Sequence, residues 1–208
     1  MRRMRGSLRP STSPSMIDEL QFSVELLETV FFTAPEPLAT ADPPRRPGLY
    51  LLLYDGDLEI YSTIKRRWPI YAGNAADLAE RFGRHRSNLV DVTDLSVDDF
   101  TVVFTPLASH GLAHYAEWLA TDTLFKPVWN QPSLAGFGSR FQGNSRTTQQ
   151  RCPWSVLHPG RRCSTGTPKR SRTELLTIVD GHLAATAPAE GVEPFPPQHA
   201  IDARIPSG

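Results

Sequence analysis

The segment Gly48-Leu49-Tyr50-Leu51-Leu52-Leu53-Tyr54 is a short apolar run that begins at a glycine and is followed by the polar sequence DGD. Such a run, too short for a typical helix and bounded by turn-forming residues, favours a buried β-strand. Three further segments have the same character and are predicted strands: residues 58–62, 69–73 and 100–107. Two segments have helical spacing of apolar residues, at 76–88 and 111–125. Together they predict a compact, mixed α/β core of about 90 residues.

The length of 208 residues suits one domain, with or without extensions, and allows a sizeable hydrophobic core. Apolar runs fall well short of the ~20 residues that a membrane-spanning helix needs. The basic N-terminal decapeptide is not followed by an apolar stretch, so we expect neither a secretory signal nor membrane attachment. Two cysteines are too few for a disulfide scaffold and favour a reducing, cytoplasmic location.

The net formal charge is zero, but charges of opposite sign occupy different parts of the chain. Residues 10–44 and 89–122 each contain six acids and no Lys or Arg. Residues 123–173 contain no acid and nine bases: Lys126, Arg140, Arg146, Arg151, Arg161, Arg162, Lys169, Arg170 and Arg172. A long polar stretch of one sign is typical of a segment that contacts nucleic-acid phosphates. A solvated basic loop is the alternative, and charge alone does not separate the two.

The segments that flank the core differ from it in composition. Residues 15–32 predict an N-terminal helix with one apolar stripe, formed by Ile17, Leu20, Val24, Leu27 and Phe31. Residues 34–47 contain five prolines and predict a linker. The tail after Thr186 has five prolines and few apolar residues, so we expect it to be disordered.

Two side chains suited to phosphate chemistry lie on the first predicted core helix. Arg81 and His85 are four residues apart, so they share one face, with β-carbons ~5–6 Å apart. An arginine can bind a phosphate group, and a neighbouring histidine can transfer a proton. The alternative is a solvated face, because Asp77 precedes Arg81, and Glu80 precedes Arg84, by four residues.

Glu117 lies in the middle of the second predicted core helix and shares a face with Ala113 and Ala120. Small neighbours predict room beside the carboxylate for a hydrated metal ion. A single carboxylate suits Mg²⁺, which keeps several waters and takes few protein oxygens. A glutamate that faces solvent is the alternative.

Two other groups of residues could suggest zinc. His110 and His114 precede Glu117, but a glycine follows His110 where the zinc-protease pattern H-E-x-x-H requires glutamate. The two cysteines flank His158 without a second cysteine pair, so two ordinary thiols are the simpler interpretation. The chain lacks Walker, G-x-G-x-x-G and G-x-S-x-G motifs, which excludes nucleoside triphosphatases, dinucleotide enzymes and α/β-hydrolases.

Two tripeptides on predicted strands, Gly48-Leu49-Tyr50 and Tyr71-Ala72-Gly73, resemble the two halves of the GIY-YIG nuclease signature. The resemblance continues in order with Arg81, His85, Glu117 and Asn130. It covers residues 47–132, with weaker similarity in GFGSRFQGNSR and RCPWSVLHPGRR. The Arg-x-x-x-His spacing and these downstream segments most resemble the type II restriction endonucleases of this superfamily, and among them the branch that cuts CCGCGG.

The resemblance implies an α/β (α+β) fold in which helices flank a small, mainly antiparallel, three-stranded sheet. It places the nuclease core at 47–135, after the predicted N-terminal arm and helix at 1–46. A basic, DNA-contacting extension with a terminal helix would follow at 136–186, and a disordered tail at 187–208.

The resemblance also implies roles for individual side chains. Tyr50 would activate or orient the attacking water, and Tyr71 would help to hold that water or the hydration shell of the metal. His85 would contact the scissile phosphate or share the role of base, and the choice between Tyr50 and His85 stays open. Because the ordinary pKa of tyrosine is about 10, a tyrosine base needs nearby cations.

The remaining implied roles are electrostatic and supporting. Arg81 would neutralise charge on the phosphorane, Glu117 would bind one Mg²⁺, with Mn²⁺ able to replace it, and Asn130 would support the geometry. The chain departs from the family pattern at Ala72, where the family has isoleucine, and at Asn74, where many relatives have a basic residue.

The partner implied by the resemblance is double-stranded DNA. Arg140, Arg146 and Arg151 are the candidates for DNA contact, since arginine is the usual reader of guanine. A palindromic target implies a homodimer and a cognate DNA methyltransferase as genetic partner. The prediction is therefore a Mg²⁺-dependent, type II site-specific deoxyribonuclease. The alternatives are a non-specific, repair or mobile-element GIY-YIG nuclease and a DNA-binding module that has lost catalysis.

Overall fold

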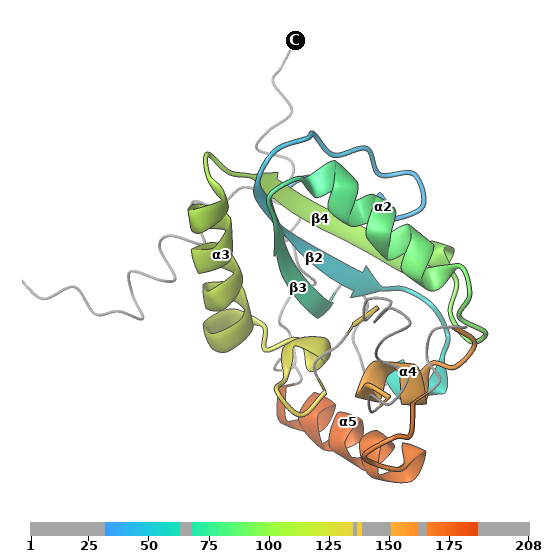
Figure 1. Ribbon diagram of the computed structural model, residues 1–208. Coiled ribbons are helices and arrows are strands. Elements are labelled where there is room, and N and C mark those ends of the chain that lie inside the picture. The colour runs from blue at the N-terminus through green and yellow to red at the C-terminus, as the bar shows by residue number, and fades with distance from the viewer. Residues whose placement is uncertain (1–31, 63–67, 135–136, 139–150, 162–165, 187–208) are drawn as a thin grey trace, which may run out of the picture.

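A computed structural model describes residues 32–62, 68–134, 137–138, 151–161 and 166–186 (Figure 1). The predicted N-terminal helix, apart from Phe32, and the tail after Thr186 lie outside the described residues. Within the described ranges, helices flank one antiparallel sheet, and two further helices pack at one end of it. None of the described helices is long and apolar enough to cross a membrane.

The sheet has the strand order β1-β4-β2-β3. Its strands are β1 at Glu36–Pro37, β2 at Gly48–Tyr54, β3 at Pro69–Ala75 and β4 at Phe100–Pro106. The central strand, β2, is antiparallel to both β3 and β4, and all its residues are buried. The mixed α/β class and the antiparallel sheet are confirmed.

The sheet has four strands rather than the three expected, because part of the proline-rich linker joins it. Residues 36–37 pair with 101–102 of β4 and form the short strand β1. Proline is compatible with this position, since an edge strand does not need every backbone N–H for pairing.

The prediction of a strand at 58–62 is wrong. The segment contains a 3₁₀ turn, η1 at Glu59–Tyr61. Both edges of the preceding strand β2 are already paired, so a strand at this place would have no partner there. The segment is held instead by its own turn and by the Tyr54 hydroxyl, which accepts the Leu58 N–H at 3.0 Å.

Two helices cover opposite faces of the sheet. Helix α2 at Leu78–Leu89 begins at Asp77, whose carboxylate accepts the Glu80 N–H, and it packs on the face that contains Tyr50 and Leu52. Helix α3 at His110–Leu119 begins at Ser109 and packs on the face that contains Leu49 and Leu51. A π-helical turn, η3 at Ala120–Leu124, and short 3₁₀ turns, η2 at Val97–Asp99 and η4 at Val128–Asn130, complete the core.

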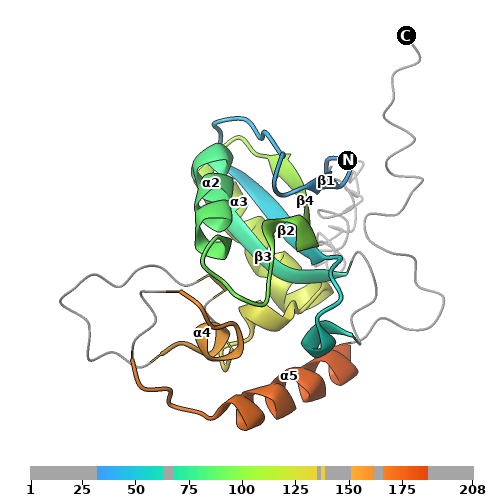
Figure 2. The same cartoon turned by 90° about the vertical axis from the view of Figure 1, so that its right-hand side faces the viewer.

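The C-terminal part packs against the same core. Helix α4 at Pro153–Leu157 buries Trp154, and helix α5 at Arg172–Thr186 buries Leu175 and Val179. Both views in Figures 1 and 2 show α5 beyond α4, at the end of the molecule away from the start of α2. The larger apolar cluster therefore runs without a break from the sheet into this extension.

Candidate active site

Four side chains from two strands and one helix form what we call the Arg–Tyr–His cluster: Tyr50, Tyr71, Arg81 and His85. The Tyr50 hydroxyl lies 2.7 Å from His85 Nε2. Arg81 donates through Nε to the Tyr50 oxygen at 2.7 Å and through Nη2 to the Tyr71 oxygen at 3.1 Å. The prediction that Arg81 and His85 share one helix face is confirmed, and that face meets the sheet.

The backbone explains why these side chains meet. Tyr50 of β2 is paired directly with Gly73 of β3, and Tyr71 lies two residues before Gly73 on the same face. A β-carbon at position 73 would collide with the Tyr50 ring and hydroxyl. The glycine of the Tyr71-Ala72-Gly73 tripeptide is therefore needed for the close approach of the tyrosine side chain, without any unusual backbone conformation.

Asp77 does not form the surface pair with Arg81 that the alternative interpretation required. It accepts the Glu80 N–H as the first cap of α2 and lies 3.7 Å from Arg45. The pair of Glu80 and Arg84 does form, at 3.3 Å. One face of α2 is thus solvated, while Arg81 is directed to the tyrosines.

Burial controls the protonation of the cluster. It raises the pKa of Tyr50 well above 10, and the opposing effect of Arg81 is smaller. The pKa of His85 is lowered to about 3, first by burial and then by the charges of Arg81 and Arg84. At neutral pH, Tyr50 is therefore protonated and donates to a neutral His85. The nearby cation expected for a tyrosine base is present, but in the free protein burial outweighs it.

His85 has one unsatisfied ring nitrogen. With Nε2 accepting from Tyr50, the ring proton of neutral His85 is on Nδ1. Nδ1 is buried and has no hydrogen-bond partner among the described residues. A buried donor without a partner costs roughly 1–3 kcal/mol, so this histidine is less stabilised than an ordinary core histidine.

Glu117 lies on the other side of β3 from this cluster. Ala72 and Asn74 alternate with Tyr71 and Gly73 along the strand and face α3. The Asn74 amide donates to the Glu117 carboxylate, and its oxygen lies 2.7 Å from His110 Nε2. Within the described ranges, Glu117 forms no hydrogen bond to the four clustered side chains, so β3 is the connection between the two groups.

The expectation that Ala113 and Ala120 leave room beside Glu117 is wrong. Both alanines are fully buried, and Ala120 packs against the sheet. Their small size permits close packing of this helix face on the strands rather than a space for a metal ion. The Glu117 side chain lies at the border of that face and is 21% exposed.

The oxygen donors at Glu117 fit a hard cation better than zinc. His114 Nδ1 lies 3.8 Å from Glu117, but the described residues contain no group of three His, Cys, Asp or Glu side chains that could hold a metal ion. A single, partly exposed carboxylate suits Mg²⁺, which keeps several waters and takes few protein oxygens. The zinc interpretation of His110, His114 and Glu117 is therefore not supported by the geometry.

Asn130 holds the edge of the sheet. Its side-chain oxygen accepts the Ala72 N–H at 2.8 Å, and its amide donates to the Ala72 carbonyl at 2.8 Å. Because β3 is an edge strand, these two bonds occupy groups that no neighbouring strand pairs. Asn130 thus fixes the strand that carries Tyr71 on one face and Asn74 on the other.

Sequence reasoning did not identify Phe137 or the contact between Asn74 and Glu117. The Phe137 ring stacks on Tyr71, with centroids 5.1 Å apart, and meets Trp154 edge-on at 5.6 Å. Strand alternation from Gly73 could have placed Asn74 on the α3 face. No local pattern marks Phe137, because its contacts depend on the path of the chain after the core.

The predicted DNA contacts are only partly described. Arg140 and Arg146 lie outside the described residues. The backbone N–H of Arg151 donates to the Thr167 carbonyl at 3.0 Å, and its side-chain Nε is buried without a hydrogen-bond partner in the described part of the chain. His158 is 2.7 Å from the Tyr61 hydroxyl, and Cys152 caps α4, so neither belongs to a metal site within the part of the chain that the structure describes.

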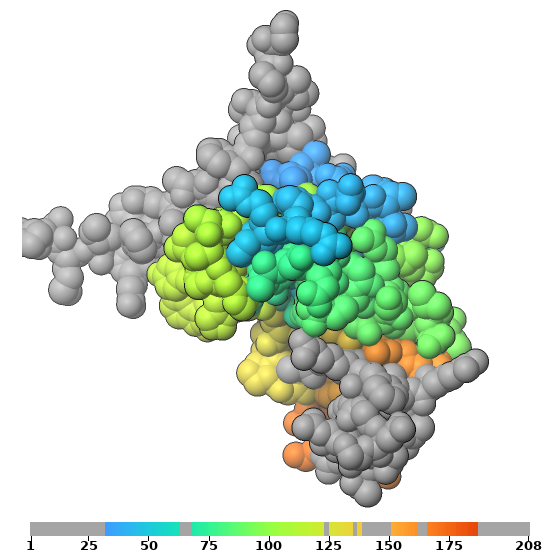
Figure 3. Space-filling model, turned by 45° about the horizontal axis from the view of Figure 1, so that its top comes forward, coloured from blue at the N-terminus to red at the C-terminus, as the bar shows by residue number. Residues whose placement is uncertain are grey.

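Figure 3 shows a face of the molecule on which the linker before β2, in blue, lies between α3 in yellow-green and α2 in green.

Residues 70–182 match the protein-family model described as the Eco29kI GIY-YIG domain. The match contains five of the six predicted catalytic positions: Tyr71, Arg81, His85, Glu117 and Asn130. A search of curated proteins found no match. Since the family match spans more than half of the 208 residues, the chain belongs to the Eco29kI GIY-YIG domain family of restriction endonucleases.

Proposed function

We propose that the protein is a Mg²⁺-dependent type II restriction endonuclease that hydrolyses double-stranded DNA at a palindromic, G·C-rich site such as CCGCGG. One observation carries most of the proposal: the Tyr50 hydroxyl contacts both Arg81 and His85. In this arrangement the Tyr50 hydroxyl contacts both a cation that can bind phosphate, Arg81, and a group that can accept a proton, His85. Membership of a restriction-endonuclease family supports the choice of DNA as substrate.

Arg81 and Tyr71 are the partly exposed members of the Arg–Tyr–His cluster, while Tyr50 and His85 are buried. The guanidinium of Arg81 uses two N–H groups on tyrosines, which leaves others for the oxygens of the scissile phosphate. Because the tyrosines hold the guanidinium in place before DNA binds, it can stabilise the phosphorane without reorganising.

Tyr50 and His85 act together as the base in this proposal. The attacking water gives its proton to the Tyr50 oxygen while the hydroxyl proton of Tyr50 passes to His85 Nε2, 2.7 Å away. The neutral state of His85 leaves Nε2 free to receive that proton. A bound phosphate adds negative charge beside the cluster and so raises the pKa of His85 relative to the free protein.

Glu117 would hold the Mg²⁺ ion, which supplies positive charge to the phosphate and to the leaving 3′-oxygen; Mn²⁺ would replace it. The hydrogen bond from Asn74 orients the carboxylate, in the way that outer partners usually orient metal ligands. Asn130 acts indirectly, as a positioning residue, because it fixes the strand between Tyr71 and Asn74.

Sequence specificity in this proposal comes from the basic stretch at 123–173, with Arg140, Arg146 and Arg151 as candidates for guanine or phosphate contacts. A palindromic site fits a twofold homodimer in which each protomer cuts one strand. Protection of the host genome from such an enzyme calls for a cognate DNA methyltransferase.

The test compares wild type with Glu117→Gln on plasmid DNA in Mg²⁺, with Mn²⁺ in parallel and run-off sequencing of the products. We expect discrete fragments from wild type and a loss of about 100-fold or more in rate for Glu117→Gln. Glu80→Gln is the matched control, since that glutamate belongs to an exposed pair on α2. Equal cleavage by wild type and Glu117→Gln would contradict the metal role.

The alternatives give different results in the same experiment. A smear instead of discrete fragments identifies a non-specific or repair nuclease. Salt-sensitive DNA binding without cleavage in either metal identifies a module that has lost catalysis.

A further inference from the structure

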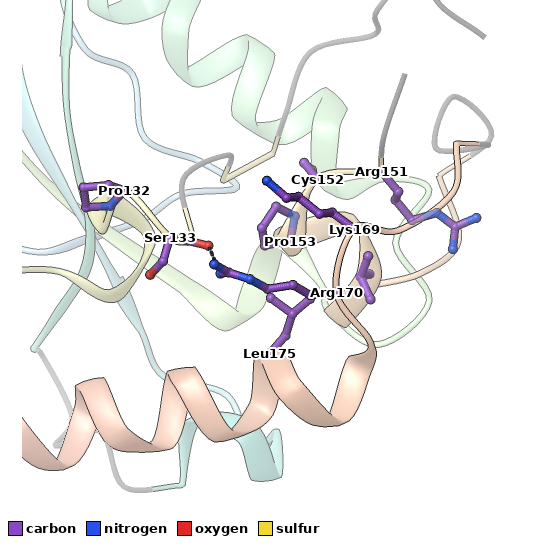
Figure 4. Close-up of a pocket in the computed structure, with 9 residues that line it drawn as sticks. Pro132, Ser133, Arg151, Cys152, Pro153, Lys169, Arg170 and Leu175 are labelled. Atoms are coloured by element: carbon purple, nitrogen blue, oxygen red, sulfur yellow. Dashed lines mark hydrogen bonds between the residues drawn. The ribbon is translucent and has the colours of Figure 1, made fainter. Parts of the chain in front are cut away.

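A cavity of about 280 Å³ lies away from the candidate active site, where the C-terminal extension meets the core. Three segments line it: the loop after η4, the start of α4 and the residues that lead into α5 (Figure 4). Its lining includes Ser133, Arg151, Pro153, Lys169 and Arg170.

Two cations extend into this cavity side by side. Figure 4 shows the Arg170 side chain ending at Ser133 and the Lys169 side chain above it, while the end of the Arg151 side chain points away from both. Arg170 donates to the Ser133 carbonyl at 3.1 Å, which fixes the position of its guanidinium and leaves further N–H groups for a ligand.

The positive charge in the cavity has no matching acid. No carboxylate lines it, and within the described ranges neither Lys169 nor Arg170 forms a salt bridge. Arg170 is near enough to Glu174 to help lower the pKa of that carboxyl, but Glu174 accepts from the Ser171 N–H and hydroxyl. Two like charges held close together without an acid repel each other, and an anion would relieve this repulsion.

Apolar side chains also line the cavity, with Pro132, Val156 and Leu175 among them. Cations together with apolar carbon suit a group whose phosphate is attached to a sugar. The chemistry therefore fits a nucleic-acid backbone better than a small, fully hydrated anion.

The cavity is also connected to the strand at the candidate active site. Ser133 follows Asn130, which binds Ala72 of β3, by three residues. On the other side, Pro153 precedes Trp154, whose ring packs on Phe137, and Phe137 in turn stacks on Tyr71. A ligand in the cavity would rest on the same packed residues that support β3.

We propose that this cavity binds a backbone phosphate of the DNA substrate at a distance from the scissile bond, with Lys169 and Arg170 as its ligands. The inference rests on the proposed function and adds a second, sequence-independent contact to it. A contact to phosphate positions the duplex but carries no base specificity.

The first test is lysine acetylation, followed by mass spectrometry, on the wild-type protein in Ca²⁺ with and without DNA. The chain has three lysines, Lys65, Lys126 and Lys169, so the readout is simple. We expect a short duplex carrying CCGCGG and a scrambled duplex of equal length both to protect Lys169. Unchanged acetylation of Lys169 in a complex that a gel shift shows to be formed would overturn the inference while leaving the proposed function intact.

Inorganic phosphate forms a separate arm of that test. If millimolar phosphate protects Lys169 and neither duplex does, the cavity is a site for a free anion, and the inference is wrong. Absence of both DNA binding and cleavage by wild type would instead remove the proposed function, and the inference with it.

The second test uses Lys169→Ala, with Arg45→Ala as control because Arg45 is an exposed cation outside both the cavity and the basic stretch at 123–173. Loss of one phosphate contact should make the slope of log K against log salt shallower by about 0.9. We expect this change, together with a higher KM and an unchanged kcat, for Lys169→Ala only. Identical slopes for the two variants would overturn the inference.

Discussion

The protein contains two tyrosine–histidine hydrogen bonds of equal length in different surroundings. Tyr50 lies 2.7 Å from His85 Nε2, and Tyr61 lies 2.7 Å from His158 Nε2. All four side chains are buried. Burial raises the pKa of both tyrosines well above 10 and lowers the pKa of both histidines.

The other groups that contact each tyrosine and each histidine distinguish the two pairs. Tyr61 accepts from the indole of Trp129 at 2.8 Å, and His158 Nδ1 lies 3.3 Å from both oxygens of Asp94. This second pair is satisfied at each end and ties α4 to the core. Beside Tyr50, by contrast, there is a charged guanidinium, and the second nitrogen of His85 has no described partner. A completed network stabilises the fold, whereas an incomplete one next to a partly exposed cation is suited to a substrate.

The largest expected difference is in catalysis. Tyr50→Phe should lower the cleavage rate by about 1,000-fold, because it removes the hydroxyl that receives the proton from water. Tyr61→Phe should leave the rate of the folded protein nearly unchanged. Single-turnover plasmid cleavage, with circular dichroism to confirm folding, measures both. Equal losses in the two variants would show that the pairs have the same role.

The next difference is in stability. His158→Ala should lower the free energy of unfolding by about 3 kcal/mol, since it opens a cavity and leaves the Tyr61 hydroxyl without its acceptor. His85→Ala should cost about half as much, because it also removes a buried nitrogen that has no partner. Urea denaturation of each variant gives these values. A larger loss for His85→Ala would reverse the comparison.

The sequence predicts the parts of the candidate site that depend on local patterns. The runs at 48–54, 69–73 and 100–107 are strands in the structure, because short apolar runs bounded by turn residues have few other ways to bury themselves. The i,i+4 spacing of Arg81 and His85 likewise puts both on the face of α2 that meets Tyr50.

Contacts between distant segments could not be predicted in the same way. The residues 58–62 resemble a strand, but they form the turn η1, in which Tyr61 contacts His158, 97 positions away. The bond from Asn74 to Glu117 needs the register of β3 against α3, and β1 forms only because β4 has a free edge. The order of charged and apolar residues along the chain does not show which distant segments come into contact.

The pH dependence of stability should be steeper for the incomplete pair. A histidine that is harder to protonate when folded makes unfolding more favourable as pH falls below its unfolded pKa of about 6.5. For His85 this loss continues down to its folded pKa of about 3, at up to about 1.4 kcal/mol per pH unit.

Between pH 6.5 and 5, the slope of the free energy of unfolding against pH should therefore decrease more in His85→Gln than in His158→Gln. Asp94 raises the pKa of His158 and offsets part of the effect of burial, whereas the charges next to His85 are both positive. Metal-free protein is used, so that binding at Glu117 does not contribute. An equal decrease in slope in the two variants would mean that Asp94 does not offset the effect of burial on the pKa of His158.

The smallest expected effect comes from Asp94→Asn, which keeps an oxygen near His158 Nδ1 but removes the charge. At pH 7, where His158 is neutral, one hydrogen bond to a carboxylate becomes one to an amide, and the loss should be about 0.5 kcal/mol. At pH 5 the loss should be larger, because without Asp94 the folded protein takes up a proton on His158 even less readily, while the unfolded chain still does so. Urea unfolding at both pH values measures this change. A loss that is the same at pH 5 and pH 7 would show that Asp94 acts on His158 only through the neutral hydrogen bond. The Tyr61–His158 pair would then differ from the Tyr50–His85 pair in its hydrogen-bond partners, but not through the charge of a neighbouring carboxylate.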